Sequence, residues 1–331
     1  MKFGVRLPRT GPFASAASMI KVAQSTEELG FDSVTVNDHI SWTRERRYHF
    51  AVGTVEAMDK VERGTNAYDA LTTISFVAGI TQKIRLIPAG LVLPWRGPVM
   101  LAKQYATLQE LSNGRAILGI CIGNIEEDFR NFGVTFKERG AITNEYLAAI
   151  KELFSDKPEI TFKGKYAEFS GEFYPKATKL SIWIAGGFNL SGLKRAAQFA
   201  DGWLPVGTPE QLRDGLNIIK DFQKEYGRTS IDLENGPETF ACIAETSAKA
   251  WKIAEGTVRK FGGLSEIARV AEGPFTEMNL VGSIDDVSKR IEEYEKAGAN
   301  YVELKFIANN LQEVLDQMSL FASQIAPSFA S

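Results

Sequence analysis

Apolar and polar residues alternate in two different rhythms along this chain. Short apolar runs rich in β-branched residues are typical of buried strands, and apolar positions three and four residues apart are typical of helices. The pattern predicts eight strands, at 3–7, 33–36, 84–91, 116–122, 182–185, 202–205, 239–244 and 301–306. It predicts nine helices, at 16–29, 67–79, 98–111, 143–154, 190–199, 209–226, 248–261, 285–297 and 311–324.

Regular alternation of strands and helices predicts parallel strand pairing, because parallel strands need long crossover connections. Eight such units are the number that closes a barrel, so we expect one α/β domain over residues 1–331, a (β/α)8 TIM barrel. An open, doubly wound sheet is the alternative, although it usually stops near five or six strands. Three insertions are expected: a long loop after the second strand, a hairpin near 159–169, and the segment 262–280.

Composition narrows the functional classes. The formal net charge is −3 and no basic stripe stands out, which argues against nucleic-acid binding. The two cysteines, Cys121 and Cys242, are far apart and offer neither a disulfide framework nor a metal-type spacing. The first residues do not read as a signal peptide and no apolar run approaches a membrane span, so we expect a cytoplasmic protein without membrane contact.

The loops after the strands hold the candidate catalytic residues, because barrel enzymes build their sites at the carboxyl ends of the strands. His39 follows the second strand within the segment VNDHISW, and the chain has only one other histidine. An imidazole there can exchange a proton near neutral pH, with the neighbouring Asp38 fixing its tautomer. A hydrogen-bonded histidine packed at the strand end is the plainer alternative.

Glycine and cysteine mark three further loops. Gly90 interrupts the third strand, which indicates either close approach of a ligand or simple packing. Cys121 ends the fourth strand, as a reactive thiol or as a small buried residue. Gly186 and Gly187 precede a helix, where their backbone N–H groups can hold a phosphate or can serve only a tight turn.

Two charged features also have a functional and a structural interpretation. The loop after the second strand contains Arg44, Arg46 and Arg47, which suggests a clamp for an anionic ligand or only a solvated charge run. On the eighth strand Lys305 and Glu303 share one face. A cofactor-free Schiff-base lyase using Lys305 is one alternative, and a structural Lys–Glu pair is the simpler one.

Five stretches together resemble the bacterial-luciferase-like superfamily, and the resemblance covers nearly the whole chain. They read FGVRLP, EELGFDSVTVNDH, LVLPWRGPVMLAKQYATLQELSNGRAILGI, GNIEEDFRNFGV and IWIAGGFNLSGLKRAAQFADGW. That superfamily contains FMN-dependent monooxygenases and oxidoreductases that use the deazaflavin coenzyme F420. The resemblance therefore implies a TIM-barrel enzyme with a flavin-type coenzyme.

The resemblance also implies roles for single residues. His39 would be the acid or base beside the reactive ring, and Cys121 is similar to a reactive cysteine beside the flavin. The family has a non-proline cis peptide at the end of the third strand, which would fall at 89–91 in this chain. The residues expected to contact the coenzyme ring or phosphate are Ala89, Gly90, Leu91, Asn124, Ala185, Gly186 and Gly187.

Three positions qualify the resemblance. Asp38 is closer to the deazaflavin branch, since luciferases tend to carry glutamate there. Asn124 stands where deazaflavin sugar-phosphate dehydrogenases carry a glutamate proton donor, so that activity is not expected, although Asn124 can position a substrate oxygen. Trp42 lies one residue closer to the histidine than its counterpart, and we expect it at the substrate together with Arg44.

The leading hypothesis is an oxidoreductase that uses coenzyme F420 (8-hydroxy-5-deazaflavin) and moves a hydride to or from a small organic substrate. His39 and Asp38 would manage the proton, with no metal involved. An FMN-dependent monooxygenase using reduced flavin and O2 is the alternative, favoured by Cys121 and the DFRNFG run. A non-catalytic flavin-binding relative is the third. The expected partners are the small-molecule substrate, a reductase that supplies reduced coenzyme, and a second copy of the chain in a homodimer.

Overall fold

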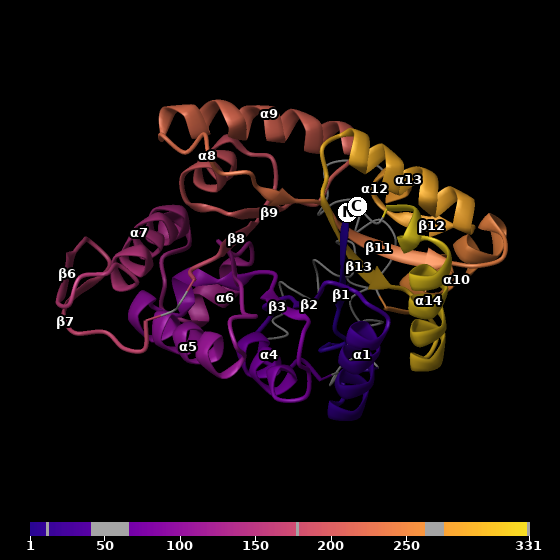
Figure 1. Ribbon diagram of the computed structural model, residues 1–331, viewed down its shortest axis with the longest axis horizontal. Coiled ribbons are helices and arrows are strands. Elements are labelled where there is room, and N and C mark those ends of the chain that lie inside the picture. The colour runs from indigo at the N-terminus through magenta and orange to yellow at the C-terminus, as the bar shows by residue number, and fades with distance from the viewer. Residues whose placement is uncertain (11–12, 41–65, 177–178, 262–274, 330–331) are drawn as a thin grey trace.

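The computed structural model describes residues 1–10, 13–40, 66–176, 179–261 and 275–329. Parallel strands run through the centre and helices surround them on the outside (Figure 1). The parallel strands are β1 (Lys2–Arg6), β2 (Ser33–Val36), β3 (Arg85–Pro88), β4 (Leu91–Val92), β5 (Leu118–Cys121), β8 (Ile182–Ala185), β9 (Gly202–Leu204), β10 (Glu234–Asn235), β11 (Glu238–Ile243), β12 (Leu280–Gly282) and β13 (Tyr301–Phe306).

The helices follow the strands in alternation. The α-helices are α1 (Ala16–Glu28), α4 (Ala70–Ala78), α5 (Pro98–Leu111), α6 (Glu126–Asn131), α7 (Arg139–Leu153), α8 (Leu190–Phe199), α9 (Pro209–Glu225), α10 (Ser247–Phe261), α12 (Phe275–Met278), α13 (Ile284–Lys296) and α14 (Leu311–Gln324). Short 3-10 turns are η1 (Leu93–Trp95), η2 (Phe136–Glu138) and η3 (Ala326–Phe329).

Hydrogen bonds carry the strand pairing around a ring. One sheet has the order β12-β11-β13-β1-β2-β3 and another has β10-β9-β8-β5-β4. The backbone N–H of Ile117 donates to Leu86 O at 3.0 Å, which links the β3 and β5 strands. On the other side Glu238 N donates to Pro205 O at 2.9 Å and Glu303 N to Pro237 O at 3.0 Å. These bonds join the two sheets at β3 and β5 and at β9 and β11, and the fold is the (β/α)8 barrel that the sequence predicts.

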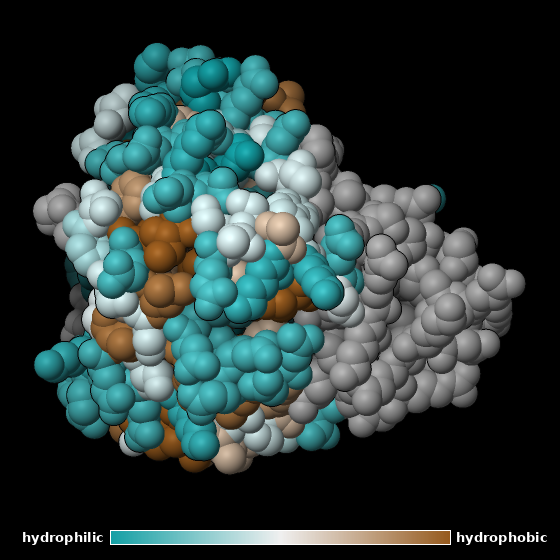
Figure 2. Space-filling model, turned by 90° about the vertical axis from the view of Figure 1, so that its right-hand side faces the viewer, coloured by the Kyte–Doolittle hydropathy of each residue, from teal (hydrophilic) through white to brown (hydrophobic). Residues whose placement is uncertain are grey.

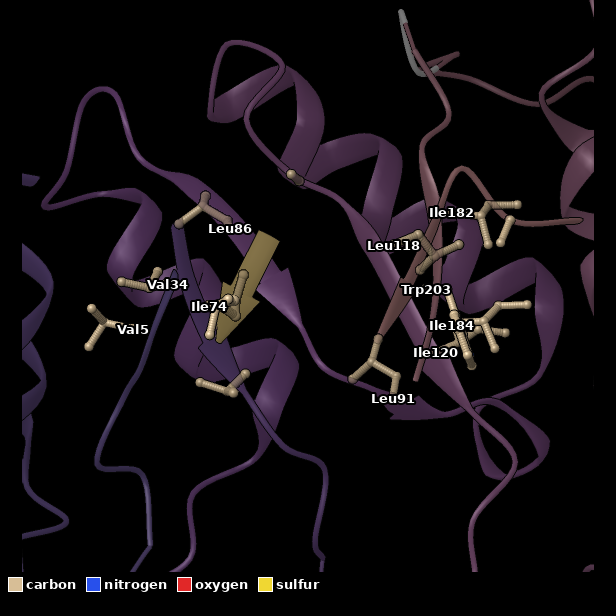
Figure 3. Packing of buried hydrophobic residues seen from close by; sticks show 14 of the residues in the cluster. Val5, Val34, Ile74, Leu86, Leu91, Leu118, Ile120, Ile182, Ile184 and Trp203 are labelled. Carbon is tan, nitrogen blue, oxygen red and sulfur yellow. The ribbon is translucent and has the colours of Figure 1, made fainter. Parts of the chain in front are cut away.

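Successive side chains of each strand point to opposite faces, so the barrel has two layers of apolar side chains, one outside the strands and one inside. Outward residues such as Val5, Val34 and Leu86 pack against helices such as α4, and Figure 3 shows this layer continuing through β5, β8 and β9. Inward residues form a separate cluster in the barrel, made of Ile87, Ala89, Ile117, Trp183, Leu204 and Tyr301. The barrel interior is therefore filled, and a ligand has to bind at one of its ends.

The insertions and the ends of the helices and strands can be compared with those that the sequence pattern predicts. The hairpin is confirmed as the antiparallel pair β6 (Ile160–Lys163) and β7 (Glu168–Gly171), which lies beside α7 at the edge of the molecule (Figure 1). The third strand is broken into β3 and β4, and α7 begins at Arg139 rather than at residue 143. The pattern did not predict α6, β10 or β12, which are all short. Residues 262–274 and the loop 42–65 lie outside the described residues.

Within the described ranges, no helix combines the length and the apolar character needed to cross a membrane. Viewed from the side of α10, α13 and α14, the coloured surface is mainly hydrophilic with apolar residues scattered among the polar ones (Figure 2). Such scattered residues are normal on helices that face water.

Candidate active site

The loop that carries His39 is fixed by a buried arginine. Arg9 is 1% exposed, and its Nε donates to Asn37 Oδ1 at 2.9 Å. Its Nη1 donates to the carbonyl oxygen of His39 at 3.3 Å and to that of Tyr68. The backbone of His39 is therefore held at the carboxyl end of β2, while its side chain is partly exposed.

Asp38 has a different role from the one that the sequence suggested. Its side chain is fully buried, and Oδ2 accepts from the backbone N–H of Val92 at 2.9 Å and from Arg96 Nε at 3.2 Å. Oδ1 accepts from Arg96 Nη2 at 2.7 Å. The expectation that Asp38 orients the His39 ring is therefore corrected: its oxygens bind the β4 backbone and Arg96. Asp38 ties the loop after β2 to the loop after β4.

A cis peptide bond joins Ala89 to Gly90, where the resemblance implied one. The bulge that contains it separates β3 from β4, and a Cβ added to Gly90 would lie 2.5 Å from the carbonyl carbon of Ile120. Glycine is therefore required there by the close approach of β5. The thiol of Cys121 donates to Gly90 O at 3.2 Å, so the ends of β3, β4 and β5 are in direct contact.

Cys121 is a protonated thiol. Burial raises its pKa to about 12, and the charges of Asp38 and Glu238 act in the same direction. A thiol with so high a pKa is a poor nucleophile, since the thiolate is the reactive form. Of the two interpretations of Cys121, the contacts favour a neutral side chain at the barrel end over an activated nucleophile.

The loop after β5 turns at Gly123. This residue has φ of +76°, and a Cβ there would lie 2.7 Å from Val92 Cγ1, so only glycine fits. Arg139 Nε donates to Gly123 O at 3.2 Å. Asn124 follows as an exposed residue, and three acidic residues then begin α6, where carboxylates are favourable near a helix start.

The loop after β8 has room at its two glycines. A Cβ added to Gly186 or Gly187 would meet no atom within 4 Å. The N–H of Gly186 donates to Leu204 O at 3.1 Å and belongs to the sheet, whereas Gly187 is exposed. Asn189 caps α8 by accepting from Gly192 N at 2.9 Å. Gly187 and the first turn of α8 are thus the part of this loop that a phosphate can approach.

The basic residues of α8 point away from that loop. Arg195 is 5% exposed and donates to Asn144 Oδ1 at 2.6 Å, on α7. Lys194 Nζ lies 4.8 Å from the centre of the Phe222 ring on α9. Neither cation turns toward Gly187, so the backbone rather than these side chains would have to hold an anion there.

Four charged residues form a second group, here named the carboxyl-end quartet after Arg6, the last residue of β1, and Lys305, near the end of β13: Arg6, Lys305, Glu303 in the middle of β13, and Glu238, the first residue of β11. Arg6 Nη2 lies 2.6 Å from Glu238 Oε2, and Arg6 Nε pairs with Glu303 Oε1. The simple Lys305–Glu303 pair suggested by the sequence is wrong, because the ion pair of Glu303 goes to Arg6. Lys305 lies with Nζ 4.5 Å from the centre of the Phe240 ring.

The structure thus joins some of the expected site residues and leaves others open. Asp38, His39, the Ala89–Gly90 bulge and Cys121 are linked by direct contacts, and Ala185 to Gly187 follow the strand next to β5. Trp42 and Arg44 lie outside the described residues. Sequence reasoning missed Arg9, Arg96 and Arg6, whose only signal was a charge within or next to an apolar strand.

Comparisons with known proteins identify the family and the fold. Residues 1–301 match the sequence family described as luciferase-like monooxygenase. A protein of Mycobacterium tuberculosis of uncharacterized function is 30% identical over 223 residues, which cover 64% of this chain and 73% of that protein.

Solved structures have the same fold. A monooxygenase from Streptomyces bottropensis superimposes with a TM-score of 0.81 at 20% identity, covering 100% of both chains. An F420-dependent secondary alcohol dehydrogenase, solved with an F420–acetone adduct, gives 0.79 at 18% identity, covering 100% of this chain and 99% of the other. The oxygenating constituent of 3,6-diketocamphane monooxygenase from Pseudomonas putida, solved with FMN, superimposes with a TM-score of 0.75 at 19% identity. The match covers 100% of this chain and 99% of the other.

Proposed function

Because the chain belongs to the luciferase-like monooxygenase family, we propose that it is an oxidoreductase that uses coenzyme F420 to move a hydride to or from a small organic substrate. The observation that carries this proposal is the contact between three loops at one end of the barrel. Asp38 joins the His39 loop to β4, and Cys121 joins β5 to the bulge at Gly90. Such convergence at the carboxyl ends of the strands is where barrel enzymes work.

The residues at this end fit a planar coenzyme with a phosphate. The bulge at Ala89 and Gly90 is buried against β5 and carries no large side chain, and we propose that the flat ring lies beside it. Gly187 is exposed at the start of α8, and no atom lies within 4 Å of the position its Cβ would take. A helix start of this kind supplies backbone N–H groups to a phosphate.

In the proposed reaction the coenzyme supplies the two-electron redox chemistry, and the chain supplies binding, orientation and proton handling. His39 exchanges the proton that accompanies the hydride, since an imidazole on a loop at the barrel end can do so near neutral pH. Arg9 and the Asp38–Arg96 pair hold its backbone in place. Asn124 is proposed to position a substrate oxygen, and Trp42 and Arg44 to contact the substrate.

The test is coenzyme binding followed by turnover. Coenzyme F420 is expected to quench tryptophan fluorescence and to change its absorbance on binding, and His39→Ala should keep this binding while turnover falls about 100-fold or more. Tight FMN binding without F420 binding would reverse the choice of coenzyme. Normal turnover in His39→Ala would remove the proton-transfer role.

An FMN-dependent monooxygenase remains the second candidate, and Cys121 is the observation that favours it. Its neutral thiol donates a hydrogen bond to Gly90 O at 3.2 Å, at the bulge proposed to face the ring. Oxygen consumption with reduced FMN, compared between the native chain and Cys121→Ala, distinguishes this candidate. A chain that binds either coenzyme without turnover would instead be the non-catalytic relative.

The expected partners remain part of this proposal. We propose a homodimer, and exposed apolar side chains on α5 give it a surface, since Met100 is 62% and Leu111 is 77% exposed. Light scattering of the native chain and of Leu111→Glu tests it, because the variant should be monomeric. A separate reductase and a cytoplasmic location stay predictions.

A further inference from the structure

The carboxyl-end quartet extends the candidate site to strands that the His39 loop does not use. Its members come from neighbouring strands, because β1 pairs with β13 and β13 pairs with β11. Glu238 lies beside Glu303 in the register, and Lys305 is two residues further along the same face of β13. The exposed side chain of Lys305 therefore stands nearer the barrel mouth than the buried carboxylate of Glu303.

Hydrogen bonding in the quartet is incomplete at one atom. Arg6 donates to Oε1 of Glu303 and to Oε2 of Glu238, so one guanidinium serves two carboxylates. Glu303 is 1% exposed, and its Oε2 has no hydrogen-bond partner within the part of the chain that the structure describes. A buried oxygen without a donor costs about 1–3 kcal/mol.

The protonation of the quartet also differs from that of an ordinary ion pair. Burial raises the pKa of Glu238 to about 7, with Glu303 acting in the same direction and Arg6 and Lys305 opposing it. Loss of solvation lowers the pKa of Lys305 to about 8, with Arg6 and Arg9 in the same direction and Glu303 and Glu238 opposing it. The two pKa shifts run in opposite directions, so they bring the proton affinities of Glu238 and Lys305 closer together than those of an ordinary glutamate and lysine.

We propose that Lys305 and Glu238 form the polar end of the substrate site, where a hydroxyl or carbonyl oxygen of the substrate binds Lys305 and exchanges its proton with Glu238. The proposal rests on the hydride-transfer function proposed above and names its substrate class, alcohols and the corresponding carbonyl compounds. Glu303 and Arg6 do not touch the substrate in this scheme. They are positioning residues that hold Glu238 in place and adjust its proton affinity.

Oxidation of the substrate releases one hydride and one proton. The substrate carbon loses a hydride, its O–H proton passes to the Glu238 carboxylate, and the C–O single bond becomes a double bond. The substrate is oxidised by two electrons, and a bound coenzyme would supply the hydride acceptor. Glu238 then gives its proton to water, and His39 would deliver a proton from water to the coenzyme side of the site. Reduction of a carbonyl compound reverses each transfer.

The first test measures the proton affinity of Glu238 directly and needs no substrate. Protein labelled with 13C at the glutamate carboxyl carbons is titrated by NMR, with and without coenzyme. One glutamate is expected to titrate at about pH 7, and its signal should be missing in Glu238→Gln. Lys305→Met should raise that midpoint by about one unit, because a nearby positive charge is lost.

The chain offers a matched control for each variant. Glu234→Gln and Lys2→Met change the same residue types at the other end of the barrel and should leave the midpoint of Glu238 unchanged. If every glutamate titrates below about pH 5.5, near the ordinary range, the quartet is a plain ion cluster and the proposal is overturned. Since this measurement works without coenzyme, failure to bind F420 would contradict the proposed function and leave this result standing.

The second test adds the substrate class. Cyclohexanol and cyclohexanone are titrated into the coenzyme-loaded protein while the Glu238 midpoint is followed. A saturable shift of the midpoint that disappears in Lys305→Met but persists in Lys2→Met is the expected result. An equal shift in Lys305→Met, or no shift with either compound, overturns the contact between the quartet and the substrate oxygen.

Discussion

The two ends of the barrel each hold two cations and two carboxylates, but the two groups differ in exposure to water and in hydrogen bonding. At the amino end Arg85 pairs with Asp32 and with Glu234, and Lys2 Nζ lies 2.9 Å from Glu234 Oε2. These side chains are between 20% and 51% exposed. At the carboxyl end the carboxylate of Glu303 is 1% exposed and one of its oxygens has no partner among the described residues.

The difference teaches that similar residue composition does not imply a similar role. The amino-end group is open to water and its ion pairs are of the kind that contributes little to stability and needs no other explanation. In the carboxyl-end group Glu303 is taken out of water, although Glu238 is 20% exposed and Lys305 is exposed, and buried ion pairs are weak evidence for stabilisation. In a barrel, the amino end usually serves stability and the carboxyl end serves chemistry.

The largest expected difference between the two ends is in stability. Arg6→Leu leaves two carboxylates without their cation and should lower the free energy of unfolding by about 3–5 kcal/mol. Arg85→Leu, at the amino end, should cost about 1 kcal/mol because water can solvate its partners. Urea unfolding of both variants measures this. Equal losses of unfolding free energy in the two variants would contradict the difference between the two ends of the barrel.

The pH dependence of stability should come next in size. Burial raises the pKa of Glu238 from 4.5 to about 7, so its contribution is full below about pH 4.5 and is lost as pH rises through about 7. Lys305 has the opposite sign: its pKa is lowered from 10.5 to about 8, so its contribution is present above about pH 10.5 and is lost as pH falls through about 8.

The Glu238→Gln variant isolates the first of these contributions. Between about pH 5 and 7 the native chain should lose of order 1–3 kcal/mol relative to the variant, since only the native chain has the carboxyl group. Unfolding curves at a series of pH values measure the difference. Glu234→Gln should run parallel to the native chain, and a parallel curve for Glu238→Gln as well would contradict the raised pKa.

Cys121 offers a smaller and more local signal. The charge of Glu238 helps to raise the pKa of this thiol, so Glu238→Gln should lower it and speed its alkylation by about two- to threefold. Iodoacetamide labelling followed by peptide mass spectrometry separates Cys121 from the buried Cys242. The Glu234→Gln variant should label at the native rate.

The smallest effect is expected at Lys2. Its side chain is 51% exposed, and the pair with Glu234 is of the surface kind. Lys2→Met should change the free energy of unfolding by less than about 0.5 kcal/mol and leave turnover as it was. A loss of turnover in this variant would show that the amino end takes part in the chemistry.

Much of the architecture could be predicted because the local signals agree with the tertiary structure. β2, β8, β13, α5, α8 and α14 lie at the expected residues, since their apolar period and their flanking proline or glycine point the same way. The hairpin was visible from its period of two. The short elements β10 and β12 were not, because three or fewer residues carry no period that a pattern can detect.

The sequence predicted which residues lie at the candidate site better than it predicted which side chains they contact. The rule that loops follow strands located His39, Gly90 and Cys121, and the resemblance located the cis peptide. Asp38 was misread because sequence neighbours seemed natural partners, whereas its oxygens reach Arg96, 58 residues further along. The pairing of Glu303 with Arg6 spans 297 residues and depends on strand register, which a single sequence does not state.

Arg96 has one more consequence, for the effect of ionic strength. Its Nη2 lies between Asp38, whose side chain is 0% exposed, and Asp69, which caps α4 and is 41% exposed. Mobile ions reach the outer carboxylate and screen it, whereas the inner one is shielded from them by the protein. Added salt should therefore speed amide hydrogen exchange at the start of α4 while exchange at Val92 keeps its rate.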